Sequence, residues 1–239
     1  MKIDRIDQHS KRYVIADIHG CYKTLRYLVE EMISPSKSDY LFFLGDYIDR
    51  GPNSSGVIDY VIDLIDNGYK VFPLRGNHEE NLLKAYEEYD SDTFSFFVKK
   101  INKSVSLLDK NNKLKEKYYN FFSHLEYYYE LDDFIIVHAG INFNAAKPFE
   151  DYTSMLELRV TLPDKKIINN KKIVVGHQVT YLNDIIKNIE NRNTILPIDN
   201  GCFYTKPHKI YDINQTGHLC CLELNSFKLI YSKNIEYDS

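Results

Sequence analysis

Side chains able to bind metal ions follow five apolar runs of this chain. They are Asp17 with His19 after Tyr13–Ala16, Asp46 after Tyr40–Leu44, Asn77 after Tyr69–Leu74, His138 after Phe134–Val137 and His177 after Ile173–Val175. One histidine after a strand is more often structural than functional, but five such coincidences favour a common site. In open α/β sheets, ligands bind outside the carboxyl ends of the strands, which is where these side chains would meet.

The chemistry of this set is that of a reactive metal centre rather than of a structural zinc cage. It offers carboxylate, imidazole and amide ligands without a thiolate, which suits Mn²⁺, Fe, Zn²⁺ or Co²⁺. The set has too many members for one ion, so the sequence predicts two divalent metal ions that share one carboxylate. Paired ions about 3.5–4 Å apart are used for phosphoester hydrolysis. Mn²⁺ is the expected ion, with Fe, Zn²⁺ and Co²⁺ as alternatives.

Amphipathic helices are predicted after the first three runs. Their apolar stripes are Leu25, Leu28, Val29 and Met32; Ile58, Val61, Ile62 and Ile65; and Leu82, Leu83 and Tyr86. Most of these residues recur at helical spacing, so three strand, loop and helix units follow one another and predict a mostly parallel sheet. Either Ser54 or Ser55 is expected to cap the second helix. The later apolar runs, Ile195–Ile198, Leu219–Leu224 and Leu229–Tyr231, are interpreted as antiparallel strands.

The length of 239 residues predicts a single α/β domain over residues 1–239. Residues 90–130 are polar, rich in lysine and aromatic, and we interpret them as a variable helical insertion with short helices around Phe94–Val98 and Leu114–Phe122. The aromatic residues between Tyr118 and Tyr129 have two interpretations. They either pack between helices or form a stacking surface for a peptide or a base.

Composition narrows the classes of partner. A net charge of -4 gives no electrostatic reason to expect nucleic acid or an anionic membrane as a partner. The N-terminal residues are charged, and no run approaches about 18 apolar residues, so we expect a cytoplasmic protein without a membrane partner. The four cysteines are irregularly spaced, which indicates neither a disulfide framework nor a zinc–thiolate site.

The motifs together resemble those of a known family. They are Asp17-x-His19-Gly, Gly45-Asp46-x-x-Asp49-Arg50-Gly, Arg75-Gly-Asn77-His78-Glu79, His138-Ala-Gly and Gly176-His177. This set resembles the signature of the calcineurin-like metallophosphoesterases, and it is most similar to the PPP-type serine/threonine protein phosphatases in their short bacterial and phage form. The resemblance implies an α/β fold in which two packed mixed β-sheets are flanked by helices, a four-layer sandwich.

The same resemblance implies a division of the metal ligands. Asp17, His19 and Asp46 would bind one ion, and Asp46, Asn77, His138 and His177 would bind the other, with Asp46 as the bridge. Two divalent ions outweigh two carboxylates and a bridging hydroxide, so the site would stay positive and attract phosphate. The expected mechanism is direct attack of that hydroxide on phosphorus, without a phosphoenzyme.

Four further residues have roles that the resemblance implies. His78 would act as general acid with Asp49 as its carboxylate partner, and the alternative for His78 is a supporting hydrogen bond only. Arg50 would bind the substrate phosphate with its planar guanidinium. Arg159 is similar to the second arginine of the family, although a surface salt bridge remains an alternative. Arg75 and Glu79 are expected to stabilise the turn that contains them.

We therefore expect a phosphatase that removes phosphate from phosphoserine and phosphothreonine, with phosphotyrosine as a further candidate. Its partner would be a phosphoprotein or phosphopeptide, and a monomer is the default. The alternative is a dinucleoside tetraphosphate (Ap4A-type) hydrolase, which shares the metal motifs. Asp49 favours the phosphatase, because the tetraphosphate hydrolases that resemble this chain often lack that carboxylate. A non-catalytic phosphate sensor is disfavoured, since no ligand of the set is missing. His218 has no assigned role.

Overall fold

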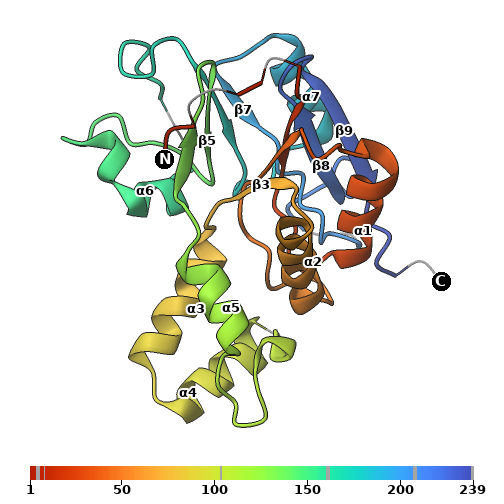
Figure 1. Ribbon diagram of the computed structural model, residues 1–239, viewed down its shortest axis with the longest axis vertical. Coiled ribbons are helices and arrows are strands. Elements are labelled where there is room, and N and C mark those ends of the chain that lie inside the picture. The colour runs from red at the N-terminus through yellow and green to blue at the C-terminus, as the bar shows by residue number, and fades with distance from the viewer. Residues whose placement is uncertain (4–5, 8, 103, 160–161, 207–208, 238–239) are drawn as a thin grey trace.

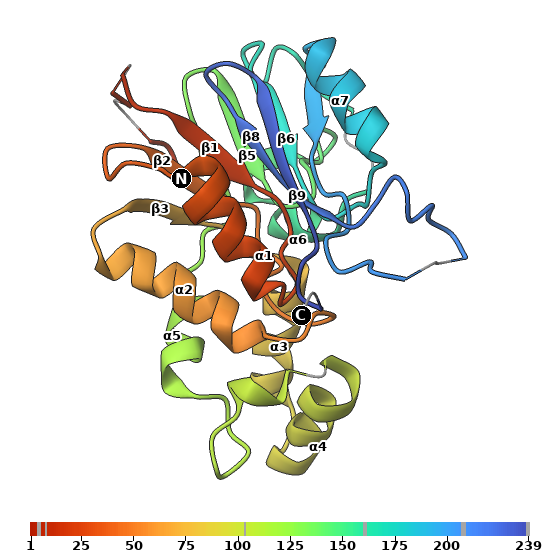
Figure 2. The same cartoon turned by 90° about the vertical axis from the view of Figure 1, so that its right-hand side faces the viewer.

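Two β-sheets packed face to face form the centre of the molecule (Figures 1 and 2). The structure is a computed structural model, and it describes residues 1–3, 6–7, 9–102, 104–159, 162–206 and 209–237. The first sheet has the strand order β3-β2-β1-β8-β9, and the second has the order β4-β5-β6-β7. Both sheets mix parallel and antiparallel pairs. The predicted fold class, two mixed sheets flanked by helices, is confirmed.

The strands of the first sheet are β1 (Arg12–Ile15), β2 (Tyr40–Phe43), β3 (Lys70–Pro73), β8 (His218–Glu223) and β9 (Lys228–Lys233). Those of the second sheet are β4 (Tyr128–Glu130), β5 (Phe134–Val137), β6 (Lys172–Val175) and β7 (Ile195–Pro197). Strands β1, β2 and β3 are mutually parallel, as are β5, β6 and β7. Each parallel set therefore has its carboxyl ends on one edge.

The helices are α1 (Tyr22–Tyr27), which continues into the π-helical η1 (Leu28–Ile33), α2 (Ser54–Asp66), α3 (Asn77–Glu88), α4 (Ser91–Phe96), η2 (Phe97–Asn102), η3 (Val105–Leu107), α5 (Glu116–Ser123), η4 (Pro148–Glu150), α6 (Tyr152–Glu157) and α7 (Leu182–Glu190). Helices α1 and α2 lie beside each other on the outer face of the first sheet (Figure 2). Met155 of α6 packs with the outer face of the second sheet. No helix in the described part of the chain combines the length and the apolar character needed to cross a membrane.

The core has one layer between the sheets and one on each outer face. Val14 and Phe42 of the first sheet meet Ile136 and Val174 of the second in the central layer. Successive residues of a strand point to opposite faces, so strands buried on both sides read as continuous apolar runs. The adjacent Cys220 and Cys221 follow this rule, because Cys220 lies between the sheets and Cys221 on the helix side.

Two local expectations were wrong. The run Ile195–Ile198 was predicted to be antiparallel, but β7 is parallel to β6, with Ile195 paired with Ile173. Helix α7 connects the two strands, and a helical crossover returns the chain to the same edge. The cap of α2 is Asn53 rather than Ser54 or Ser55, because the Asn53 side chain accepts a hydrogen bond from the Gly56 N–H.

The region of the predicted helical insertion contains the short helices α4 and α5, which lie with α3 in a group beside the sheets (Figure 1). Its aromatic side chains are mainly packing residues. Tyr118 is 1% exposed and Phe122 is fully buried. Phe121 contacts Tyr47 of the β2 loop with ring centroids 5.5 Å apart. The packing interpretation is confirmed for Tyr118 and Phe122, and a stacking surface formed by the half-buried rings of this region stays a prediction.

Candidate active site

The loops that follow β1, β2 and β3 form what we call the first rim of the site. His19, Asp46 and Arg50 of this rim have positive φ angles of 48°, 51° and 64°. Non-glycine residues adopt this conformation only when surrounding contacts hold it, and it is common at functional sites. Gly76 allows a close approach, since a Cβ atom there would lie 2.2 Å from Asp46 Oδ1. The tight backbone places several polar side chains within one small volume.

Glu79 holds the first rim together from beneath. Its fully buried carboxylate accepts hydrogen bonds from the N–H groups of Asp46 (2.9 Å), Tyr47 (2.9 Å) and Gly76 (3.0 Å). A buried carboxylate with several donors is well compensated for its loss of hydration. The Arg75 guanidinium instead contacts Glu80 and Tyr127, away from the turn's centre. The expected structural role of Glu79 is therefore confirmed.

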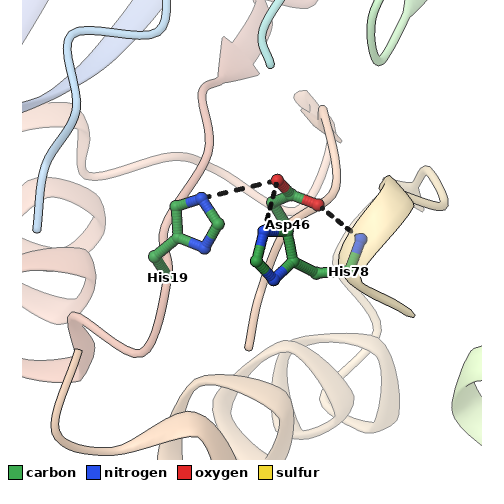
Figure 3. Close-up of side chains that lie close together, drawn as sticks. All are labelled: His19, Asp46 and His78. Atoms are coloured by element: carbon green, nitrogen blue, oxygen red, sulfur yellow. Dashed lines mark hydrogen bonds and ion pairs between the residues drawn. The ribbon is translucent and has the colours of Figure 1, made fainter. Parts of the chain in front are cut away.

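Asp46 lies at the centre of two groups of possible metal ligands. Ligand atoms of His19, Asp46 and His78 all lie within 4.8 Å of one another, and the same holds for Asp46, His138 and His177. Asp46 Oδ2 is 3.4 Å from His19 Nε2 and 3.9 Å from His78 Nε2 (Figure 3). Asp46 Oδ1 is 3.7 Å from His138 Nε2. The side chain expected to bridge two ions is thus the one that both groups share.

The loops that follow β5, β6 and β7 form the second rim. His138 is fully buried, and its Nδ1 lies 2.9 Å from the Leu44 carbonyl oxygen, which directs Nε2 into the site. His19 is held in the same way by the Ile48 carbonyl at 2.9 Å. Such backbone contacts fix the tautomer and the ring orientation of metal-binding histidines. Asn77 Oδ1 is 3.2 Å from both His138 Nε2 and His177 Nδ1.

The residues present fit a divalent metal centre. Asp17 Oδ1 and His177 Nε2 are buried atoms with no hydrogen-bond partner. Buried polar atoms without partners are rare, and an ion at such a place removes the cost. Oxygen and imidazole nitrogen donors without thiolates suit the ions expected from the sequence. The predicted ligands are therefore close together and chemically suitable.

Asp17 is placed differently from the other predicted ligands. It belongs to neither ligand group, and His78 takes its place beside His19 and Asp46. Its Oδ2 accepts a hydrogen bond of 2.8 Å from the His177 N–H, so Asp17 connects the two rims. A Cβ atom on Gly176 would lie 2.0 Å from Asp17 Oδ1, which explains why a glycine precedes His177. The role of Asp17 as a ligand stays a prediction.

The electrostatics of the site favour an ionised Asp46 and neutral side chains at His19, His138 and His177. Burial raises the pKa of Asp46, but the imidazoles of His138, His78 and His19 outweigh it and hold the pKa below its usual value. Burial lowers the pKa of both His19 and His138, and it lowers the pKa of His177 to about 4. Metal ligands must be deprotonated to bind, so these shifts prepare the site for cations.

His78 lies beside the predicted metal ligands, between Asp49 and Arg50. Its Nδ1 lies 2.6 Å from Asp49 Oδ2, and its Nε2 lies 3.2 Å from Arg50 Nη2. Although burial lowers the pKa of His78, Asp46 and the hydrogen bond to Asp49 raise it above its usual value. Ser104 of the helical insertion donates a 2.8 Å hydrogen bond to Asp49 Oδ1. The insertion therefore contributes to the orientation of His78.

The two predicted phosphate-binding arginines lie on opposite rims. Arg50 is exposed, and its guanidinium lies 4.5 Å from the centre of the Phe203 ring. Arg159 is also exposed and follows α6. Its charge helps to lower the pKa of His177 after burial and His138, so it lies within electrostatic reach of the second rim. It also lines a cavity of about 310 Å³ with Gln178 and Thr180.

Asp199 is a site residue that the sequence interpretation missed. It follows β7 and is 2% exposed, and its Oδ1 accepts a 2.7 Å hydrogen bond from the Gly201 N–H. Burial raises its pKa to about 6, and its charge raises the pKa of Asp17. The sequence contained a signal for this residue, because Asp199 directly follows the apolar run Ile195–Ile198, as Asp17 and Asp46 follow theirs. The run was interpreted as antiparallel, which placed its end elsewhere. His218 instead hydrogen-bonds Asn200 through Nδ1 at 2.9 Å.

Sequence comparisons place the chain among known proteins. The family model described as calcineurin-like phosphoesterase matches residues 10–217. A symmetrical bis(5'-nucleosyl)-tetraphosphatase from Buchnera aphidicola subsp. Acyrthosiphon pisum (strain Tuc7) is 42% identical over 74 residues, 31% of this chain and 26% of the relative. A relative of the same name from Vibrio parahaemolyticus serotype O3:K6 is 29% identical over 136 residues, 54% of this chain and 44% of the relative. The chain thus spans less than half the length of these relatives.

Solved structures show the same fold. A protein provisionally described as a diadenosine tetraphosphatase has a TM-score of 0.62 at 16% identity, over 97% of this chain and 96% of that one. A protein serine/threonine phosphatase from Saccharomyces cerevisiae has a TM-score of 0.59 at 15% identity, over 97% and 81%. At such identities the likeness concerns the fold alone.

The relatives correct one expectation. A serine/threonine protein phosphatase with a phosphoprotein substrate was predicted, and this prediction is wrong, because the curated relatives are named tetraphosphatases. The physical reason concerns Asp49, which carried the choice. Asp49 is 5% exposed and contacts His78 and Ser104, so its carboxylate orients an imidazole and cannot distinguish a serine from a nucleotide. The match over residues 10–217 shows that this chain belongs to the calcineurin-like phosphoesterase family.

Proposed function

We propose that this chain is a metal-dependent hydrolase that splits a symmetrical dinucleoside tetraphosphate into two nucleoside diphosphates. The observation that carries the reaction class is the position of Asp46, whose carboxylate lies in two groups of metal-binding side chains at once. The substrate class is supported by the names of the curated relatives.

The proposed ligands of one divalent ion are Asp17, His19 and Asp46, and those of the other are Asp46, Asn77, His138 and His177. When bound, two such ions supply an acidified water as nucleophile and positive charge next to the phosphate oxygens. We propose Mn²⁺ for this site, which its oxygen and imidazole donors suit.

Arg50 and His78 would act on the same phosphate group. The guanidinium of Arg50 is a planar donor that can bind two phosphate oxygens, and its stacking on Phe203 limits its freedom to move. Arg50 Nη2 donates a hydrogen bond of 3.2 Å to His78 Nε2 in this structure. When a phosphate takes over the Arg50 guanidinium, Nε2 would be released to carry a proton toward an oxygen that leaves that phosphate. Asp49 stabilises the protonated ring through Nδ1. Arg159 is the proposed contact for the phosphates on the second rim.

Hydrolysis of the proposed substrate requires little proton donation from His78. The leaving group is a nucleoside diphosphate, and a terminal phosphate has a second pKa near 6, so its oxygen leaves without full protonation at neutral pH. An alkoxide leaving group, by contrast, must be protonated as it departs. The cleavage of a phosphoanhydride therefore depends more on phosphate positioning by Arg50 than on proton donation.

A comparison of substrates tests this function. Mn²⁺-loaded protein is incubated with diadenosine tetraphosphate or with a phosphoserine peptide, and the products are separated by ion-exchange chromatography. We expect ADP as the sole nucleotide product and a higher kcat/KM for the tetraphosphate than for the peptide. Release of ATP with AMP would contradict symmetrical cleavage, and a higher kcat/KM for the peptide would contradict the substrate class.

A further inference from the structure

A continuous series of aromatic rings runs outward from the first rim. We call Phe203, Tyr204, Tyr211 and Tyr181 the aromatic patch. The Phe203 ring lies 5.1 Å from the His19 ring and 4.2 Å from the Tyr204 ring. Tyr204 is in turn 5.2 Å from Tyr211, and Tyr211 is 6.4 Å from Tyr181. The patch therefore begins at a predicted metal ligand and leads away from it.

Two tyrosines of the patch contact backbone atoms of neighbouring residues, and the rings of the patch lie outside the buried core. Tyr204 packs over Gly201, where a Cβ atom would lie 2.6 Å from the Tyr204 ring, so the close packing requires glycine. The Tyr181 hydroxyl donates a 3.4 Å hydrogen bond to the Ile210 carbonyl, next to Tyr211. Tyr204 and Tyr211 are both half-buried. A ring that is fixed and partly exposed has a surface on which a planar ligand can stack.

The inner end of the patch lies beside the phosphate-binding arginine. Arg50 stacks on Phe203 at 4.5 Å, and Phe203 contacts His19 edge to face. Burial and the neighbouring Tyr211 raise the pKa of Tyr204, whereas the Arg50 guanidinium lowers it, so Tyr204 also lies within electrostatic reach of Arg50. A phosphate at Arg50 would therefore have Phe203 as its first aromatic neighbour, and Tyr204 and Tyr211 would come next.

We propose that Tyr204 and Tyr211 bind one nucleobase of the substrate by stacking, while Phe203 positions Arg50. This inference rests on the proposed function, because it assigns a subsite for that substrate. Symmetrical cleavage occurs at the middle of the tetraphosphate, so the base on the attacked half is separated from the reacting phosphorus by one further phosphate and a ribose. The order of groups along a nucleotide, phosphate, sugar and then base, matches the order Arg50, Phe203, Tyr204 and Tyr211 along the patch.

The aromatic groups in the helical insertion are more enclosed. Tyr118 and Phe122 are buried within the insertion, Tyr129 lies between the sheets, and the half-buried Phe121 and Tyr127 pack on Tyr47 and Tyr152. Base stacking on aromatic side chains tolerates all bases, because every base has a π-face. The patch would thus distinguish nucleotides from phosphates that carry no base, without selecting adenine strongly.

A binding measurement isolates the base. ADP and methylenediphosphonate, which lacks ribose and base, are titrated into Mn²⁺-loaded protein by isothermal calorimetry. We expect Tyr204→Ala and Tyr211→Ala each to weaken ADP binding about 5- to 100-fold, the loss expected when a base loses one stacking partner. Binding of methylenediphosphonate should change less than about twofold, because the phosphate contacts remain. Tyr204→Phe should keep the wild-type affinity for ADP, since the ring is retained.

The matched control is Tyr89→Ala. Tyr89 is a half-exposed tyrosine at the end of α3 that also contacts another ring, Phe97, at 6.0 Å. It should leave the affinity for both ligands unchanged. Equal losses of ADP and methylenediphosphonate in the Tyr204 and Tyr211 variants would overturn the inference, and so would unchanged ADP binding. These outcomes are separate from the proposed function, which is tested by the products that wild-type protein releases from diadenosine tetraphosphate and by its kcat/KM for that substrate relative to the phosphoserine peptide.

Discussion

The two rims of the site contribute different chemistry, although both are loops at the carboxyl ends of parallel strands. The first rim carries the charged groups Asp46, Asp49 and Arg50, with His78 among them, on a backbone with several positive φ angles. The second rim carries the buried imidazole His138 and the half-buried His177. The first rim is supported by the buried Glu79 carboxylate beneath it.

This difference indicates that the first rim provides most of the charged groups, whereas the second rim provides neutral metal-binding groups. The first rim places Asp46, the proposed acid His78 and the proposed phosphate-binding Arg50 in contact, with His78 between the other two. The second rim supplies neutral ligands whose low pKa values keep them available for cations. Asp46 contacts His19 of the first rim and His138 of the second. A substitution of Asp46 should therefore affect both rims at once.

The largest effect is expected from Asp46→Asn. The substitution removes the charge that both rims share, so both ions should be lost and activity on diadenosine tetraphosphate should fall to background, by more than about 100-fold. Even residues that only hydrogen-bond to a metal ligand contribute about 10- to 100-fold. Metal content is measured by atomic emission after gel filtration. Asp63→Asn, at an exposed carboxylate of α2, is the matched control, and retention of both ions in the Asp46 variant would contradict the shared role.

A smaller and substrate-dependent effect is expected from His78→Asn. Hydrolysis of glycerol 2-phosphate, which has an alkoxide leaving group, should slow by about 10² to 10⁴, the usual contribution of a general acid. Hydrolysis of diadenosine tetraphosphate should slow by less than about 10², because its leaving phosphate needs little protonation. Steady-state rates on the two substrates give the ratio. Equal losses would show that His78 acts only by supporting the first rim.

Glu79→Ala tests the support of the first rim as a stability effect. The variant leaves the buried N–H groups of Asp46, Tyr47 and Gly76 without their acceptor, so the free energy of unfolding should fall by about 3 kcal/mol. Urea denaturation of the metal-free protein measures this change. The neighbouring Glu80→Ala removes a more exposed ion pair with Arg75 and should cost less than about 1 kcal/mol. If the two variants lose the same stability, the rim does not depend on Glu79.

The smallest effect is expected from Ser104→Ala, which tests how the helical insertion reaches the first rim. Loss of the hydrogen bond to Asp49 Oδ1 should lower kcat about fivefold, equivalent to about 1 kcal/mol, the net value of one hydrogen bond. KM should not change, because Ser104 acts through Asp49 and His78. Ser123→Ala serves as control in the same kinetic assay, because the Ser123 hydroxyl hydrogen-bonds the Asn120 carbonyl and the neighbouring His124 Nδ1 at the end of α5. A changed KM with constant kcat would argue for a direct substrate contact.

Sequence reasoning succeeded where a side chain and the strand before it form one local unit. The alternation of apolar strands with Asp17, Asp46, Asn77, His138 and His177 was sufficient to predict that these loops meet. It failed for Asp199, whose strand was assigned the wrong direction, because direction depends on the crossover by α7 rather than on the strand itself. The substrate was also misjudged, since Asp49 contacts the catalytic machinery and not the organic part of a substrate.

Two tyrosine-rich regions show that the sequence does not reveal which aromatic side chains remain exposed. Residues 118–129 contain more aromatic side chains than residues 203–211, and the sequence drew attention to the richer region. Burial separates the two regions differently, because Tyr118 and Phe122 are enclosed by helices, whereas Tyr204 and Tyr211 are half-buried in a series of rings that begins with Phe203 beside Arg50. Composition counts aromatic rings, but only packing decides which faces remain open to a ligand.

The sequence by itself determined the fold class, the family resemblance and the identity of the clustered donors, because hydrophobic periodicity and strand-end placement are local properties of the chain. Only the tertiary structure decided that Asp46 lies in both ligand groups, that Asp17 connects the rims through the His177 N–H, and that Ser104 supports Asp49 from a distant segment. These contacts join residues that are far apart in the chain, 55 positions for Ser104 and Asp49 and 160 for Asp17 and His177, so no local pattern of the sequence can fix their distances.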